Sequence, residues 1–184
     1  MNVTQAISTR RSVKRLTDPA PADDEVISLV ETAANAPDHG LLRPWRLILV
    51  RGGARDALGD ACARAASGTP DAQERARAKP LRAPLLVSIV FCPQQHEKVP
   101  EWEQLAATAA MVHALELLLH DRGWGVIWRT GAGLDAPQIR QLLGLPVEER
   151  LLGWLYVGTP LPAGGRVSRP PIDVGTKVSV LSGA

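Results

Sequence analysis

The strongest candidate for an anion-binding site is a basic segment near the N-terminus, Arg10-Arg11-Ser12-Val13-Lys14-Arg15. Its guanidinium forks and a hydroxyl donor lie so close together that they could hold one phosphate group. The alternative is a solvated basic helix end, because clusters of basic residues are common on protein surfaces. The residues alone leave both interpretations open.

A second candidate is the set His113, Glu116 and His120, which are spaced three and four residues apart in a helical segment. Such spacing places the three side chains on one helix face, where they could bind a transition metal. The sequence offers no obvious fourth ligand, and any amphipathic helix shows a polar stripe of this kind. We therefore expect no metal site and keep a metal-binding helix as an alternative.

The common motifs of side-chain catalysis are missing from the sequence. It has no GxSxG elbow, no HExxH, no P-loop and no GxGxxG after a strand. This absence favours an enzyme whose chemistry belongs to a bound cofactor, since the protein then supplies only binding, orientation and electrostatics. It equally permits a protein without catalysis, and we assign no side chain as catalytic.

The elements that must position these residues follow from periodicity and punctuation. Apolar runs rich in β-branched residues predict strands, and amphipathic or Ala-rich stretches predict helices. The expected strands are 45–50, 85–91, 123–128 and 151–157. The expected helices are 2–9, 22–35, 56–66, a charged segment ending near Lys79, 101–122 and 138–143.

Length and composition limit the classes of protein. The 184 residues suit a single domain, with an extended, proline-containing tail from about residue 160 to 184. The net charge of +2 does not demand nucleic acid, and the apolar stretch 105–119 is too short to span a membrane. We therefore expect neither nucleic acid nor a membrane as partner. Cys62 and Cys92 form no CxxC pair, which suits a reducing, cytoplasmic setting.

Several separated segments resemble the nitroreductase family. The 10–15 segment is similar to its N-terminal RRSxR signature, and Ala36-Pro37 with Pro44-Trp45 is similar to its APSxxNxQPW segment. Further segments resemble the minimal YdjA-type branch of the family: 36–39, 98–104, 127–132 and 156–160. The matches keep their order from about residue 5 to residue 160.

The resemblance implies an α+β fold with a central mixed sheet flanked by helices, in an intertwined homodimer with two FMN sites built from both chains. It implies NAD(P)H as co-substrate and hydride transfer through the flavin to small electron-poor acceptors such as nitroaromatics or quinones. The cofactor-binding residues carried over are Arg10, Arg11, Ser12, Lys14, Asn35, His39, Trp128, Arg129, Thr130 and Arg169. Arg10, Arg11 and Ser12 would hold the phosphate and ribityl chain, and Lys14 would reach the pyrimidine edge.

The chain departs from the family pattern at the second motif. Leu41 replaces the motif asparagine and Arg43 replaces the glutamine, so polar contacts at the flavin edge and the preferred acceptor are open. Two further functions stay open as well: a flavin-binding sensor without catalysis, and a nucleic-acid module that uses residues 10–15. The few aromatic residues argue against the nucleic-acid module, because base stacking needs such residues.

Overall fold

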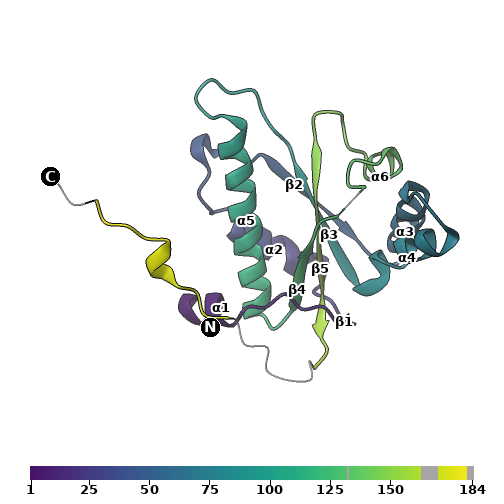
Figure 1. Cartoon of the computed structure of the whole chain (residues 1–184), viewed down its shortest axis with the longest axis horizontal. Helices are drawn as coiled ribbons and strands as arrows, with labels where there is room; N and C mark the ends of the chain where they lie inside the picture. The colour runs from purple at the N-terminus through teal and green to yellow at the C-terminus, as the bar shows by residue number, and fades with distance from the viewer. Residues whose placement is uncertain (132, 163–169, 182–184) are drawn as a thin grey trace.

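A single antiparallel sheet organises the chain, for which the computed structural model describes residues 1–131, 133–162 and 170–181 (Figure 1). The long strand β5 (Arg150–Pro160) pairs with β3 (Leu85–Phe91) and with β4 (Gly125–Arg129), while β2 (Trp45–Val50) pairs with β3. The two-residue strand β1 (Leu16–Thr17) pairs with the end of β5. The mixed character expected for the sheet comes from one parallel bridge, between Ser12 and Val126.

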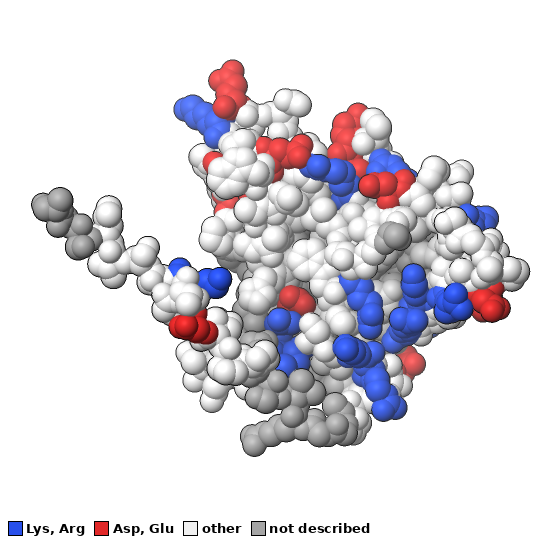
Figure 2. Space-filling view, in the orientation of Figure 1, with Lys and Arg blue, Asp and Glu red and all other residues white. Residues whose placement is uncertain are grey.

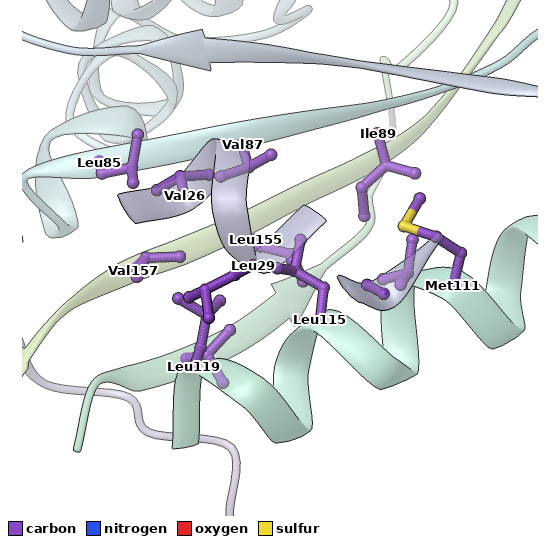
Figure 3. Packing of buried hydrophobic residues seen from close by; sticks show 13 residues of the cluster. Val26, Leu29, Leu85, Val87, Ile89, Met111, Leu115, Leu119, Leu155 and Val157 are labelled. Atoms are coloured by element: carbon purple, nitrogen blue, oxygen red, sulfur yellow. The ribbon is translucent and has the colours of Figure 1, made fainter. Parts of the chain in front are cut away.

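Strand β3 is the centre of the fold because helices cover both faces of the sheet. All seven of its residues are buried, and its aliphatic side chains are divided between two hydrophobic clusters on opposite faces. On one face, Val87 and Ile89 pack against α2 (Asp23–Ala33) and α5 (Glu101–Asp121), as Figure 3 shows. On the other face, Leu86 and Val90 share a cluster with residues of α3 (Gly53–Ala65) and α6 (Pro137–Leu143).

The helices lie in two layers (Figure 1). Helices α2 and α5 cover one face, and α3 (Gly53–Ala65), α4 (Pro70–Arg77) and α6 (Pro137–Leu143) lie on the other side. Local signals set several helix ends: Thr69 caps α4 with Pro70 in its first turn, and Gly144 ends α6 in the left-handed conformation. The first helix, α1 (Val3–Thr9), begins with a reciprocal capping box between Asn2 and Gln5.

Helix α5 is apolar on more than the face that meets the sheet. Met111, Leu115 and Leu119 are buried in the core, yet Trp102 and Leu105 stand in solvent at 68% and 41% exposure. A helix that is apolar all round is normally buried on all sides. In the described part of the chain, no helix is both long and apolar enough to cross a bilayer.

A bulge in β5 shapes the end of β4. The register between β3 and β5 shifts at Ile89, so that Leu152 is left out of the pairing. Its carbonyl accepts a hydrogen bond from the Trp128 indole at 3.1 Å. The next residue, Gly153, has φ +120°, and a Cβ there would lie 2.4 Å from the Arg129 carbonyl oxygen. Only glycine fits at this position, which allows β4 to approach closely.

Most predicted elements are confirmed with small changes of boundary. Strands β2 and β3 match their predicted ranges, α5 ends one residue early, and β4 starts two residues late at Gly125. The prediction missed β1 and the short 3₁₀ turns η1 (His39–Leu41), η2 (Pro80–Arg82) and η3 (Val174–Thr176). Residues 170–181 run away from the sheet and its helices (Figure 1).

Candidate functional site

The basic segment lies in extended form along the start of β4. Ser12 forms the parallel bridge to Val126, and the Val13 amide donates to the Val126 carbonyl at 3.0 Å. The Ser12 and Lys14 side chains are exposed, whereas Arg10 and Arg11 are partly buried. The sheet thus fixes the backbone of the segment and leaves its hydroxyl and ammonium groups accessible.

Arg10 contacts a buried carboxylate on α5. Its Nη1 atom lies 3.6 Å from Oε1 of Glu116, whose side chain is only 8% exposed. Burial of an unpaired carboxylate is costly, so this guanidinium helps to hold the start of the chain against α5. Arg11 donates to the carbonyls of Ser8 and Arg10, at 2.7 and 2.8 Å.

The three helix residues considered as metal ligands do not converge on one point. Glu116 meets Arg10 and lies 3.7 Å from His113, and His120 Nε2 lies 2.8 Å from the Thr9 hydroxyl oxygen. Burial, followed by the charge of Arg10, lowers the pKa of His120. The described ranges contain no cluster of three side chains able to hold a metal ion. The metal alternative therefore finds no support in this geometry.

The end of β4 opens into a cavity of about 800 Å³. Trp128, Arg129 and Thr130, all predicted to face the flavin, line it together with Gly131. Arg129 is held in place by the ring of Tyr156, with its guanidinium carbon 5.4 Å from the ring centre. The predicted second segment therefore forms the wall of a cavity of the size that small-molecule sites have.

Three cations missing from the predicted site residues line the same cavity. Arg75 comes from α4, Lys79 from the turn after it, and Arg82 from η2. Figure 2 shows Lys and Arg side chains gathered on this side of the molecule. Arg75 and Lys79 are four residues apart and fall in the charged segment that the sequence predicts as a helix, whereas Arg82 lies beyond its predicted end near Lys79.

Buried donors in the cavity wall lack partners. Arg129 Nε and Trp154 Nε1 are both buried, and neither has a hydrogen-bond acceptor among the described residues. Burial also raises the pKa of Tyr156 to about 12 and raises the pKa of Cys62, so both groups stay protonated at neutral pH. The described lining residues include no carboxylate. The cavity wall therefore presents hydrogen-bond donors and positive charge, which suits an anionic ligand.

Asn35 and His39 lie in a different part of the chain. Asn35 donates to the carbonyls of Glu31 and Thr32, at the end of α2. His39 Nδ1 lies 2.7 Å from Oε2 of Glu103, in a shallow hollow of about 300 Å³ against α5. Gln104, which follows Glu103 in α5, is buried. Its hydrogen bonds to the loop before α5 fix the first turn of that helix.

One chain does not bring the predicted residues together. Glu103, which holds His39, and Glu116, which contacts Arg10, lie about 20 Å apart along α5 at 1.5 Å of rise per residue. Ser12 pairs with Val126 of β4 and Arg10 contacts Glu116 of α5, whereas Asn35 bonds within α2 and His39 contacts Glu103. Arg169 is outside the described residues.

The loop around His39 carries the two departures from the family motif. Leu41 and Arg43 both have left-handed backbone, with φ of 52° and 46°. Asparagine tolerates this conformation better than leucine does, because its short polar side chain can hydrogen-bond locally. The motif asparagine would therefore suit the backbone at Leu41, and the substitution there places strain in the loop.

Comparison with known proteins gives a consistent result. The model of the nitroreductase family matches residues 7–159. YdjA of Escherichia coli (strain K12), provisionally named an NAD(P)H nitroreductase, is 33% identical over 163 residues, which cover 87% of this chain and 89% of YdjA. A nitroreductase-like family protein from Bacillus cereus superposes with a TM-score of 0.83 at 28% identity, over 100% of this chain and 97% of that chain.

More distant structures show the same fold. The FMN and NADPH-dependent nitroreductase NfnB from sphigopyxis sp. strain HMH has a TM-score of 0.77 at 18% identity, over 99% of this chain and 100% of that chain. The α+β fold expected from the sequence is thereby confirmed.

Proposed function

The chain belongs to the nitroreductase family, and we propose that it is an FMN-dependent oxidoreductase that passes hydride from NAD(P)H through the flavin to small electron-poor acceptors such as nitroaromatics or quinones. The names of its relatives support the cofactor and the co-substrate. The structural observation that carries the proposal is the alignment of the basic segment along β4, which ends in a donor-lined cavity.

The residues along this edge fit a phosphorylated flavin. Arg10, Arg11 and the exposed Ser12 hydroxyl form a donor set suited to the phosphate. Trp128 and Thr130 would lie against the ring, where backbone amides and a hydroxyl can hydrogen-bond its polar edge. The bulge at Leu152 and the glycine at 153 fix the position of this wall before any ligand binds.

When bound, FMN supplies two-electron hydride chemistry. The residues of this chain provide binding and electrostatics. Lys14 lies on the exposed side of the segment, from which its ammonium would approach the pyrimidine edge, where negative charge gathers on reduction. Arg129, fixed over Tyr156, adds positive charge to the same wall. Both cations favour acceptance of hydride from the nicotinamide.

The second half of each site is proposed to come from another copy of the chain. The exposed apolar side chains of α5 and α1, among them Trp102, Leu105 and Ile7, suit burial in a homodimer interface. The hollow at His39 contains Trp102 and so belongs to the same face. A dimer packed through α5 would carry Asn35 and His39 of one chain to the phosphate-binding segment of the other.

We infer a single domain with a C-terminal tail that packs on the partner. The tail leaves the apolar side chains of Ile172, Val174 and Val178 exposed in one chain.

We also propose a cytoplasmic setting for the protein. Cys62 and Cys92 are free thiols, which is compatible with that setting.

An absorbance spectrum and one reduction experiment test the function. We expect purified protein, supplied with FMN and desalted, to keep a flavin spectrum. Under anaerobic conditions NADH or NADPH should bleach it, and a quinone or nitroaromatic should restore it. Flavin that stays bound but is never bleached would support the noncatalytic sensor instead, and loss of all flavin on desalting would contradict the cofactor assignment.

A further inference from the structure

The cavity at the end of β4 carries more positive charge than the proposed flavin site needs. Arg75, Lys79 and Arg82 line it from α4, the turn after α4 and η2, and Arg129 lines it from β4. In the described ranges none of the first three has a carboxylate within ion-pair distance, although Arg77, on the same helix, is paired with Asp60 and Glu74. Unpaired cations concentrated in a concave site attract an anion.

We propose that this cavity binds the anionic group, a carboxylate or phosphate, of the small aromatic molecule that accepts electrons from the flavin. The proposal rests on the proposed function and names its class of substrate. The electron acceptor would then be an aromatic acid rather than a neutral quinone or nitroaromatic.

The buried donors point to the same ligand. The residues Arg129 and Trp154 line the cavity, and their buried Nε and Nε1 atoms have no acceptor in the described part of the chain. A buried donor without a partner is costly, and an anion that enters this wall would supply an acceptor. Tyr156 and Trp128 supply aromatic surface beside the cations, which suits a flat ring that carries the charge.

The location favours the acceptor over the cofactor phosphate. Ser12 and Arg10 lie beside the start of β4, whereas the cavity is lined from Ile127 onward and continues past Thr130. The flavin would cover Trp128 to Thr130, so an anion among Arg75, Lys79 and Arg82 would lie beyond the ring. An acceptor held there has its electron-poor group next to the flavin.

The reaction balances with the reagents already named. Bound FMN would relay one hydride from NAD(P)H to the nitro group of the acceptor. With that hydride and one proton from the buffered solvent, the nitro compound would become the nitroso compound and one oxygen would leave as water. The carboxylate of the acceptor takes no part in bond changes, so it serves only to bind and orient.

The test compares 4-nitrobenzoate with its neutral methyl ester. The measured quantity is the ratio of their kcat/KM values, in the wild type and in the triple variant Arg75→Gln/Lys79→Gln/Arg82→Gln. Because each charge-assisted contact contributes about a factor of ten, and the two oxygens of one carboxylate would contact one or two of the three cations, the ratio should fall about 10- to 100-fold in the triple variant. Arg64→Gln removes an exposed charge on α3 outside the cavity and should leave the ratio unchanged.

Three outcomes would overturn the proposal. An unchanged ratio would show that the cations do not contact the acceptor. Loss of FMN in the triple variant would assign the cavity to the flavin. A selective loss of reduction by NADPH, with reduction by NADH kept, would assign it to the 2′-phosphate of the electron donor.

A direct binding measurement separates this proposal from the proposed function. Quenching of the cavity tryptophans by 4-nitrobenzoate does not need turnover. If the wild type shows no turnover but binds 4-nitrobenzoate at least 10-fold more tightly than the triple variant does, the cavity assignment stands and only the redox function fails. Equal binding by both proteins would contradict the cavity assignment itself.

Discussion

Replacement of Arg10 by alanine should affect FMN binding and folding through two different contacts. If Arg10 binds the phosphate, loss of one charge-assisted hydrogen bond should weaken FMN binding by about 1.5–3 kcal/mol, or about 10- to 150-fold. The same change removes the contact with Glu116, whose carboxylate lies 3.6 Å away and is nearly buried.

The stability cost can be bounded from the geometry. Breaking a fully buried ion pair costs about 3–5 kcal/mol. Arg10 keeps 19% exposure of its side chain, and the contact is long, so we expect about 1–2 kcal/mol in this case. The double variant Arg10→Ala/Glu116→Gln removes the stranded charge, and should therefore recover most of the stability without recovering FMN affinity.

Two assays separate the effects. Urea unfolding of the apoprotein gives the stability of each variant, and titration of flavin fluorescence gives the FMN dissociation constant. The reasoning would be refuted if the double variant recovered both quantities. In that case Arg10 would only fasten the N-terminal segment to α5.

Three further predictions concern positions away from Arg10. Gly153→Ala should lower the free energy of unfolding by about 1–3 kcal/mol and displace Trp128, because the new Cβ meets the Arg129 carbonyl and φ is +120°. Urea unfolding measures the loss of stability, and tryptophan fluorescence measures the displacement. Leu41→Asn should stabilise the chain by about 0.5–1 kcal/mol, measured by thermal unfolding, because asparagine accepts the left-handed backbone. The hydrogen bond from Arg46 lowers the pKa of Glu149, so its stabilisation is present above about pH 4.5 and is lost as the pH falls through the lowered value. Urea unfolding at pH 7 and pH 3 should therefore show a loss in the wild type about 1 kcal/mol larger than in Glu149→Gln.

Each of these predictions has a matched control or a contrary result. Gly53→Ala adds a methyl group where no atom lies within 4 Å and should be nearly neutral, so equal losses at both glycines would refute the crowding argument. A destabilised Leu41→Asn would show that the leucine side chain makes a contact that outweighs the backbone preference. Parallel pH profiles for the wild type and Glu149→Gln would mean that the Arg46 pair contributes nothing to folding.

The fold was largely predictable because its elements are strongly patterned. The apolar run of β3 is short and rich in β-branched residues, which predicts a strand. The apolar stretch of α5 is much longer, which predicts a helix. Strand β1 was missed because two residues carry no periodicity. The 3₁₀ turns were missed because their backbone depends on neighbouring loops.

The site was predictable only where the chemistry is local in the sequence. The 10–15 segment and the β4 exit appear as short motifs, and the structure places the 10–15 segment beside the start of β4. The contact between Arg10 and Glu116 joins residues far apart in the chain, and no local pattern predicts it. Arg82 likewise reaches the cavity only because α4 and η2 pack against α3, close to the β4 exit. In the proposed dimer, the position of His39 relative to the phosphate segment would depend on the second chain.

A subunit-mixing experiment tests most directly whether two chains share each flavin site. One variant is Arg10→Ala/Glu116→Gln and the other is His39→Ala, each predicted to be defective as a homodimer. Unfolding and refolding them together should restore about a quarter of the wild-type NAD(P)H oxidation, because half of the dimers are mixed and each mixed dimer has one intact site. The FMN concentration is set to fill wild-type sites only. No recovery, in samples shown by mass spectrometry to contain mixed dimers, would contradict the shared site.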